Sequence, residues 1–493
     1  MKENRYNLID ENWIPVAGKG KVGLRSIFSD FSITALGGDP VGKIAVFKLL
    51  LAIAQSAYTP EDEGDWKSLG CAGLQQKVLD YLDAHYDCFW LYGAHPFLQM
   101  TEIAKAHTVP FGSVRMEVAT GNSTVVTEIQ VEKKVQDDEK ALIVITLMGF
   151  ACGGKKTDNS IVLTKGYTGK AKTGKAGPSL GYMGLLHSFF LFNSVIDSVY
   201  KNLFTKQQIA GMGMFPDGIG TAPWFLTPDG EDDEIAKKLR KSYMGRLIPM
   251  SRFLLLADDG IHYSEGISNP GYAEYVVDPS VSVNFAVKPK PKILWVDPER
   301  KPWRQLTSLL SFLDTETNSG FNCGQLRNVK QRCLDSHCFT IWSGGVRVSS
   351  NAGEQYLTGT DDFVESEIQL SPDIFGSSFF GKLSVEMGNL ESIAKKLYGS
   401  ILRYYENLLC DGKQLAAQGT NTFWQLCEGV FQELVNACES DSSENEVKAL
   451  RKEYHRYALQ IFDEQCPNQT ARQLEAWAKN RPYSMYKEEI VNE

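Results

Sequence analysis

The chain has 493 residues, of which 43% are hydrophobic, and its formal net charge is -9 at pH 7. A chain of this length and composition can bury a sizeable core in two or more domains, and its acidic balance excludes a uniformly basic nucleic-acid-binding protein. Any contact to nucleic acid would therefore have to come from local basic segments.

The sequence carries no sign of export or membrane insertion. Asp10, Glu11 and Asn12 interrupt the apolar run near the N-terminus, whereas an export signal requires an unbroken apolar core. No apolar stretch reaches the length of about 18 residues that crosses a bilayer without a charged or polar break. The ten cysteines include no Cys-x-x-Cys pair, which favours free thiols and argues against a structural zinc site. We therefore expect a cytoplasmic protein that binds no metal and no other cofactor.

The first expected element is a short strand in the run YNLIDENWIPV. Apolar and polar residues alternate between Leu8 and Trp13, and Pro15 confines a strand to a sheet edge or a strand end. An amphipathic helix is expected to begin at Asp39, because this residue is a good N-cap and Pro40 fits the first helical position.

The middle of the chain mixes helix and strand signals. Expected helices lie at residues 73–85, 181–203 and 303–313, and expected strands at residues 141–147, 252–256, 292–296 and 339–342. The adjacent acids Asp361 and Asp362 indicate a turn, because neighbouring residues of a strand point to opposite faces.

The C-terminal region has an almost purely helical pattern. Apolar residues recur at spacings of three and four from residue 389 onward, and polar connections separate the segments. This pattern is typical of antiparallel helices packed in a bundle. The sequence therefore predicts an α+β fold, with a large mixed α/β N-terminal globular domain (residues 1–370) followed by a C-terminal four-helix bundle (residues 371–493).

The strongest local reversal of charge is the Lys-Gly segment, residues 153–181. It contains six lysines, seven glycines and a single acid, Asp158. Glycines let a backbone approach phosphates or a groove edge closely, and lysines release the counterions condensed on nucleic acid. We interpret this segment as a nucleic-acid-binding loop; a flexible surface loop with solvated lysines is the alternative.

Enzymatic motifs are incomplete. The run GKAKTGKA from Gly169 matches a phosphate-binding P-loop, but Ala176 replaces the Ser or Thr that binds magnesium, and a Gly-Pro pair follows instead of a helix. The sequence contains neither a Gly-x-Ser-x-Gly nor a His-Glu-x-x-His motif. Its one local Cys/His cluster, formed by Cys333, His337 and Cys338, is interpreted as an approach to a strand rather than a ligand set. A non-enzymatic protein is expected, and a P-loop-like nucleotide hydrolase is the enzymatic alternative.

A second basic run surrounds Lys288, Lys290 and Lys292, which alternate with prolines. Proline favours an extended conformation, so these lysines are expected on a stiff finger that can enter a groove. An edge strand guarded by lysines is the alternative.

Residues 342–356 indicate a β-hairpin with a Gly-Gly turn, strand residues around Arg347 and a polar tip at Ser349, Ser350 and Asn351. A plain structural hairpin is the alternative. On the third C-terminal helix, Arg451, Lys452 and Arg456 form a ridge that fits either phosphates or a solvated, salt-bridged face.

Six segments occur in the same order as in a known family. They are NLIDENWIPV at residue 7, HPFLQ at 95, a Gly-Gly pair at 153, GPSLG at 177, TAPWFLTP at 221 and GRLIPMSRFLLL at 245. With these motifs the chain resembles the large subunit (CasA family) of the type I-E CRISPR Cascade surveillance complex. The resemblance implies a non-catalytic subunit that recognises the protospacer-adjacent motif (PAM) and helps to open the duplex for R-loop formation. The implied partners are the guide RNA (crRNA), the other Cascade subunits, double-stranded target DNA and an effector helicase-nuclease.

The resemblance also assigns sites. The implied PAM-recognition loop is Gly153, Gly154 and Lys155, and the implied lysine finger is Lys288 or Lys290. The implied wedge between the DNA strands is Ser349, Ser350 and Asn351, and the implied guide-contact loop holds Asn122 and Thr124. The ridge of Arg451, Lys452 and Arg456 is expected to contact the displaced strand or a neighbouring subunit. A scaffold subunit without direct DNA readout is the alternative.

Overall fold

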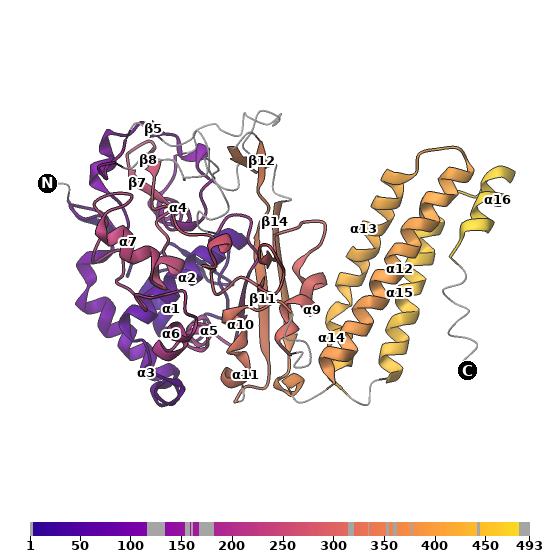
Figure 1. Ribbon diagram of the computed structural model, residues 1–493, viewed down its shortest axis with the longest axis horizontal. Coiled ribbons are helices and arrows are strands. Elements are labelled where there is room, and N and C mark those ends of the chain that lie inside the picture. Colours follow the sequence, from indigo (N-terminus) through magenta and orange to yellow (C-terminus); the bar gives the residue numbers. More distant parts are fainter. Residues whose placement is uncertain are drawn as a thin grey trace. The chain divides into compact units, whose positions relative to one another are not determined.

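The computed structural model describes most of the chain (Figure 1). Described residues are 3–115, 134–152, 158, 161–166, 182–313, 320–333, 335–351, 354–357, 362–375, 378–440 and 444–482. The chain divides into two compact units. Unit 1 comprises Met1–Pro302, Ser319–Asp335 and Thr340–Glu367, and unit 2 comprises Trp303–Asn318, Ser336–Phe339 and Ile368–Glu493.

Unit 1 surrounds a buried helix. Its helices are α1 (Leu24–Ser29), α2 (Pro40–Ala57), α3 (Glu63–Ala84), α4 (Asp137–Gly149), α5 (Val195–Asn202), α6 (Lys206–Gly211), α7 (Glu234–Arg240), α8 (Met244–Leu247), α10 (Gly324–Arg327) and α11 (Val329–Arg332). The prediction of a helix beginning at Asp39 is confirmed: the Asp39 carboxylate accepts hydrogen bonds from the N–H groups of Val41 and Gly42. Helix α2 packs against α3, α4, α5 and α8. Among the described helices it alone has the length and apolarity of a membrane span, and 83% of that stretch is buried inside the protein, as in a core helix.

The strands form several small sheets. They are β1 (Arg5–Asn7), β2 (Ile14–Val16), β3 (Gly20–Val22), β4 (Trp90–Tyr92), β5 (Thr108–Val109), β6 (His187–Leu191), β7 (Arg252–Leu256), β8 (Ile261–Glu265), β9 (Val283–Asn284), β10 (Lys292–Ile293), β11 (Phe339–Val346), β12 (Ser349–Asn351), β13 (Glu354–Tyr356) and β14 (Phe363–Leu370). Two sheets have three strands, in the orders β14-β11-β6 and β5-β8-β7, and the remaining strands pair as β1-β4, β2-β3, β9-β10 and β12-β13. The strands expected at residues 252–256 and 339–342 are confirmed.

The N-terminal motif is a buried turn rather than the expected strand. Leu8, Ile9 and Trp13 are fully buried between β1 and β2. The Asn7 side chain accepts a hydrogen bond from the Ile9 N–H (3.0 Å), and the Trp13 indole N–H donates to the Leu8 carbonyl (2.9 Å). These local bonds reverse the chain, so the alternating apolar pattern reflects a turn that fills the core.

Two further expectations are wrong. Residues 141–147, expected as a strand, lie in α4, which starts at a capping box between Gln136 and Glu139 and is buried along most of its length. A continuous apolar run of this length does not distinguish a buried helix from a strand. The helix expected at residues 181–203 is instead β6 followed by α5, because the Ser194 hydroxyl accepts a hydrogen bond from the Asp197 N–H and starts a new helix.

Unit 2 is a helical bundle. Its helices are α9 (Leu306–Leu309), α12 (Phe379–Asn407), α13 (Lys413–Gly429), α14 (Phe431–Glu439), α15 (Glu444–Gln465) and α16 (Ala471–Asn480). Helices α12, α13 and α15 pack against one another, α14 packs against all three, and α16 packs against α12. The helix expected at residues 303–313 is reduced to α9 with 3-10 turns on either side. The predicted α+β fold class with a C-terminal helical bundle is confirmed.

Candidate nucleic-acid interface

Part of the predicted interface lies outside the described residues. This holds for the PAM-loop residues Gly153, Gly154 and Lys155 and for the guide-loop residues Asn122 and Thr124. The structure does describe both flanks of the Lys-Gly segment, namely residues up to Cys152 and from Tyr182 onward.

The two flanks of the Lys-Gly segment are joined by a backbone hydrogen bond. The N–H of Tyr182 donates to the carbonyl oxygen of Gly149, with an N···O distance of 2.9 Å. A Cβ atom at Gly149 would lie 2.1 Å from the Tyr182 ring, so only glycine fits at this position. On the incoming side, the Arg252 guanidinium donates to the Cys152 carbonyl (2.9 Å). The segment is thus held at both ends, by α4 and by β7.

Acids inside and beside the Lys-Gly segment hold its backbone. Asp158 accepts a hydrogen bond from the His107 N–H at 2.9 Å. The buried Glu231 carboxylate accepts one from the Thr164 N–H at 2.8 Å. Lys165 is exposed and has no ion-pair partner among the residues whose positions are described. The acids therefore stabilise the local backbone and leave the positive charge of Lys165 available.

A buried polar network lies next to Tyr182. The Lys48 ammonium forms an ion pair with Asp278 and lies 4.3 Å from the centroid of the Tyr182 ring. The Ser280 hydroxyl donates to Asp278 (2.8 Å) and contacts Nδ1 of His187 (2.8 Å). Lys48 and His187 are almost inaccessible to solvent, so the network supports the fold and the position of Tyr182 rather than acting on a ligand.

Burial and charge set the protonation states in this network. Burial lowers the pKa of His187 from 6.5 to about 3, because the imidazolium would lose its hydration. Burial by itself opposes ionisation of Asp278, but the nearby Lys48 ammonium outweighs it and lowers the pKa of this carboxyl. A neutral histidine therefore lies beside a buried ion pair at pH 7.

The lysine-proline run forms a short hairpin. Strands β9 and β10 pair antiparallel, with Asn284 opposite Lys292, and residues 285–291 form the connection. Lys288 and Lys290 are exposed there, and neither has an ion-pair partner within the described ranges. The expected extended finger is wrong in conformation, because the Asn284 side chain accepts a hydrogen bond from the Ala286 N–H (3.0 Å) and starts a turn before the prolines.

The predicted β-hairpin is present, but its strands lie further along the chain than expected. Ser349 lies opposite Tyr356, and Ser350 lies opposite Gln355. Ser349, Ser350 and Asn351 thus form strand β12 rather than a tip, and the two residues between the strands lie outside the described ranges. Their role as a wedge stays a prediction.

The expected Gly-Gly turn is also corrected. Gly344 and Gly345 lie inside β11, where a Cβ atom at Gly345 would come within 2.6 Å of the Leu185 carbonyl oxygen. Asp362 is buried and forms an ion pair with Arg347, which donates from Nε at 2.8 Å. Close packing within a strand, rather than chain reversal, explains the two glycines. Asp362 lies in a 3-10 turn directly before β14, in line with the expected turn, and Asp361 lies outside the described residues.

Residues that flank three predicted DNA-binding segments lie together at Gly184, a position that the sequence analysis did not identify. A Cβ atom at Gly184 would lie 3.4 Å from the Trp295 ring and 4.0 Å from Cβ of Val348. The Val296 N–H donates to the Gly184 carbonyl (3.0 Å). Gly184 follows the Lys-Gly segment, Trp295 follows the lysine hairpin and Val348 precedes β12. One end of each segment is therefore attached near the same point of unit 1. The GPSLG motif, which ends three residues before Gly184, was the sequence feature that could have drawn attention to this position.

The ridge on α15 is largely neutralised within unit 2. Arg451 forms an ion pair with the buried Glu386, and Arg456 pairs with Glu453. Lys452 is exposed and, among described residues, has no partner. The salt-bridged alternative therefore describes the two arginines, and Lys452 is the ridge residue whose charge no described acid neutralises.

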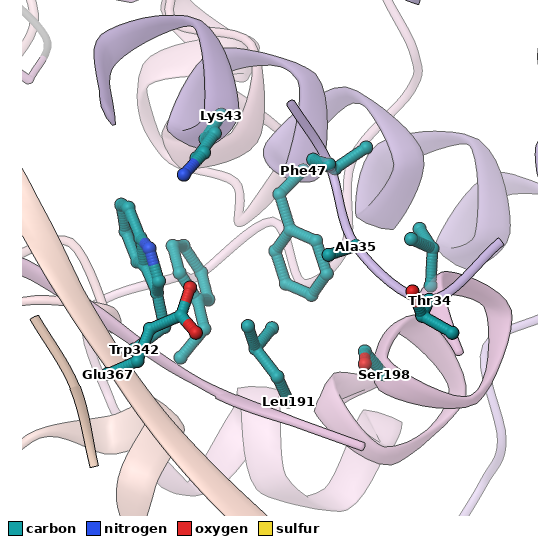
Figure 2. Close-up of a pocket in the computed structure, with 11 residues that line it drawn as sticks. Thr34, Ala35, Lys43, Phe47, Leu191, Ser198, Trp342 and Glu367 are labelled. Carbon is teal, nitrogen blue, oxygen red and sulfur yellow. The ribbon is translucent and has the colours of Figure 1, made fainter. Parts of the chain in front are cut away.

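An apolar pocket of unit 1 lies between α2, α5 and the β14-β11-β6 sheet (Figure 2). Phe47, Leu191 and Trp342 contribute to its lining, and Lys43 and Glu367 bring charge to it. Glu365 accepts from both the Lys43 ammonium (2.7 Å) and the Trp342 indole N–H (3.0 Å). The lining offers apolar surface and a paired lysine rather than an acid–base or nucleophilic constellation.

No cluster of three or more metal-ligating side chains occurs within the described ranges. Cys333 is buried, and the thiol of Cys338 accepts a hydrogen bond from the Gln369 side chain (3.0 Å). Burial raises the pKa of Cys333 to about 11, which favours the thiol over the thiolate that binds metals.

Comparison with known proteins identifies a family. A sequence profile of the family described as CRISPR-associated protein Cse1 matches residues 7–461. The curated CRISPR-associated protein CasA/Cse1 of Thermus thermophilus is 29% identical over 163 residues. That alignment covers 30% of this chain and 32% of the Thermus protein, less than half of either.

Solved structures share the fold over nearly the whole chain. The crystal structure of Thermobifida fusca Cse1 has a TM-score of 0.73 and 16% identity, and the match covers 99% of this chain and 98% of that one. A chain of a structure described as a CRISPR RNA-guided surveillance complex has a TM-score of 0.67 and 13% identity, and covers 98% and 99%. At these identities the matches show a common fold.

Proposed function

The chain belongs to the CRISPR-associated protein Cse1 family, and from this premise we propose that it is the large, non-catalytic subunit of a type I-E CRISPR Cascade complex. In this role it recognises the PAM in double-stranded target DNA and helps to open the duplex. The fold shared with a chain of an RNA-guided surveillance complex supports this proposal. The guide RNA and the other Cascade subunits are its proposed partners, and the cytoplasm is its proposed location.

The convergence at Gly184 carries the proposal. The Lys-Gly segment, the lysine hairpin and the β12-β13 hairpin are far apart in the sequence, yet residues that flank them lie together at Gly184, where an added Cβ would be 3.4 Å from Trp295 and 4.0 Å from Val348. The exposed Lys165, Lys288 and Lys290 have no acidic partner among the described residues, so they can neutralise phosphates. Because the three segments are attached near the same point, one DNA duplex can contact all of them at once.

Each segment has a distinct proposed task. Gly153, Gly154 and Lys155 read the minor groove beside the PAM, because glycines permit close approach and the lysine adds a positive charge. Lys288 or Lys290 enters the same groove from the hairpin turn. The β12-β13 hairpin, with Ser349, Ser350 and Asn351 in its first strand, acts as the wedge that separates the DNA strands.

Sequence recognition beyond the PAM is delegated to pairing between the guide and the target strand. Asn122 and Thr124 contact the guide or a neighbouring subunit in this scheme. Once the R-loop has formed, the subunit recruits or licenses the effector helicase-nuclease. The protein thus contributes recognition and strand opening, while cleavage belongs to the partner.

The decisive experiment compares duplex binding by the guide-RNA complex reconstituted with and without this chain. Matched targets carry either a permissive or a scrambled PAM. The complete complex is expected to prefer the permissive target. The double variant Gly153→Asp with Gly154→Asp is expected to lose that preference without dissociating from the complex, because two carboxylates are repelled by the DNA phosphates.

The matched control is Gly381→Asp combined with Gly388→Asp. Both glycines are exposed positions on α12 with open space around the missing Cβ, so this variant adds the same charge elsewhere. It should retain PAM preference. Equal binding with and without the chain would instead indicate a scaffold subunit without DNA readout.

A further inference from the structure

The β9-β10 hairpin and its surroundings expose apolar side chains as well as lysines. Large apolar residues exposed within the described ranges include Tyr275 (50%), Phe285 (41%), Val287 (40%) and Trp295 (38%). The proposed PAM contact uses none of these side chains. A concentration of exposed apolar groups on one surface marks a binding site more often than a scattered set does.

Tyr275 and Phe285 form an exposed aromatic stack. Their ring centroids lie 6.1 Å apart, with an interplanar angle of 18°. Tyr275 has a φ of +62° at the end of the 3-10 turn Tyr272–Glu274. Bulky residues rarely adopt this backbone conformation, and such strain concentrates at binding sites. The conformation holds a half-exposed ring in a defined place.

Neighbouring contacts fix this turn to the rest of unit 1. The ring of Tyr272 packs edge-on against Trp295, with centroids 5.9 Å apart. Trp295 in turn packs against Gly184, where the three candidate DNA segments converge. The turn that carries Tyr275 is therefore connected, through Tyr272 and Trp295, to the backbone of Gly184.

The combination of flat rings and free ammonium groups favours one kind of ligand. Phe285 lies three residues before Lys288 in the same turn, and neither Lys288 nor Lys290 has an acidic partner in the described part of the chain. Aromatic rings stack on the faces of bases, and these faces are free only when nucleotides are unpaired, because a duplex presents base edges in its grooves. The lysines supply phosphate contacts. Glu274 is the exposed acid next to Tyr275, so the positive charge comes from the hairpin turn.

We propose that Tyr275 and Phe285, together with Lys288 and Lys290, form a binding surface for unpaired nucleotides of single-stranded DNA. The inference rests on the proposed function in taking DNA as the ligand. It adds base stacking to a hairpin otherwise expected to make only a groove contact. A nucleotide released beside the PAM is held on this surface, which disfavours re-pairing of the opened duplex.

The test titrates the full chain against a fluorescein-labelled oligothymidylate of about a dozen nucleotides at several salt concentrations. Tyr275→Ala with Phe285→Ala is expected to weaken binding about 5- to 150-fold at an unchanged salt slope, because stacking carries no charge. Lys288→Ala with Lys290→Ala is expected to reduce the slope of log K against log salt by about 1.4, at about 0.7 per phosphate contact on a single strand.

Two controls accompany these variants. Tyr275→Phe retains the ring and should bind as the wild type does. Phe31→Ala removes another exposed aromatic side chain of unit 1, 48% exposed, and should leave the affinity unchanged. Equal melting temperatures of all variants would show that the truncations leave the fold intact.

Wild-type affinity in the Tyr275→Ala, Phe285→Ala variant would overturn the inference. So would loss of complex assembly at unchanged oligonucleotide affinity, which would assign the surface to a protein partner. The oligothymidylate carries no PAM and pairs with no guide. Its binding can therefore persist when PAM preference fails, or fail when PAM preference persists, and the two proposals are separable.

Discussion

The indole ring of Trp295 lies against the backbone of Gly184, where a Cβ atom would be 3.4 Å from two ring carbons. Gly184 also has a φ of +75°, in the left-handed region that L-residues with side chains rarely adopt. The contact joins the end of the Lys-Gly segment to the strand that follows the lysine hairpin. The proposed interface therefore includes a backbone position at Gly184 whose positive φ favours glycine.

Replacing Gly184 by alanine is expected to destabilise unit 1 and to impair PAM-dependent binding. The left-handed backbone costs about 1–2 kcal/mol for a residue with a Cβ, whereas the added methyl group would only touch the Trp295 ring at 3.4 Å, an ordinary van der Waals distance. Gly213→Ala is the matched control, since Gly213 has a φ of +70° with nothing within 4 Å of the added Cβ. Chemical denaturation and duplex binding by the reconstituted complex measure the two effects. Equal PAM preference in both variants would argue against a role of the Gly184 region in PAM recognition.

His187 is expected to make the stability of the protein depend on pH. Its pKa is about 3 in the folded chain and 6.5 for an unperturbed histidine. Because the depressed pKa keeps the folded state unprotonated, its stabilisation is complete above pH 6.5 and is lost as pH falls toward 3. The expected slope from this residue is about 1.4 kcal/mol per pH unit.

His187→Gln removes the titrating group and keeps a side chain that can hydrogen-bond to Ser280. Urea denaturation between about pH 7 and about pH 5 should show a shallower loss of stability in this variant than in the wild type. Parallel pH profiles for the two proteins would mean that the imidazole of His187 becomes protonated without unfolding.

Lys452 is expected to carry the DNA contact of the α15 ridge. Its ammonium is unpaired among the described residues, unlike the guanidinium groups of Arg451 and Arg456. Lys452→Glu should weaken R-loop formation and lower the magnitude of its salt slope by about 1. Arg456→Gln, which breaks an exposed ion pair with Glu453, serves as the control with little expected effect. An unchanged salt slope in Lys452→Glu would leave a subunit contact as the role of the ridge.

Arg451 is expected to stabilise unit 2. Its partner Glu386 is buried, and removing one member of a buried pair leaves an uncompensated charge. Arg451→Met should lower the free energy of unfolding by about 1–3 kcal/mol, a range reduced because Arg451 itself is partly exposed. The double variant Arg451→Met with Glu386→Leu should recover much of this loss. A melting temperature that the single substitution leaves unchanged would contradict the assignment.

PAM selection is expected to be permissive. The minor groove presents nearly the same pattern for A·T and T·A pairs, so a short glycine loop with one or two lysines distinguishes few sequences there. Selection from a library of randomised PAMs should return several permitted trinucleotides. A single permitted trinucleotide would contradict readout through the minor groove.

Local sequence signals predicted those helices whose formation depends on interactions between residues close together in the chain. The N-cap at Asp39 and the three-and-four spacing along α12 and α15 predicted helices that the structure confirms. Capping and periodicity act within a few residues, so a single stretch of sequence contains them. The apolar run in α4 was wrongly expected to be a strand, because a fully buried helix and a buried strand have the same apolar composition.

For the candidate site too, the sequence identified some residues and only the tertiary structure identified others. Clustered lysines and glycines identified the Lys-Gly segment and the lysine-proline run, since charge and backbone freedom can be read directly from residue types. The tertiary structure alone decided that Gly184, Trp295 and Val348 meet, because their contacts join residues more than 50 positions apart. It also decided that Arg451 is neutralised while Lys452 is not, because an ion pair depends on which acid another helix brings near.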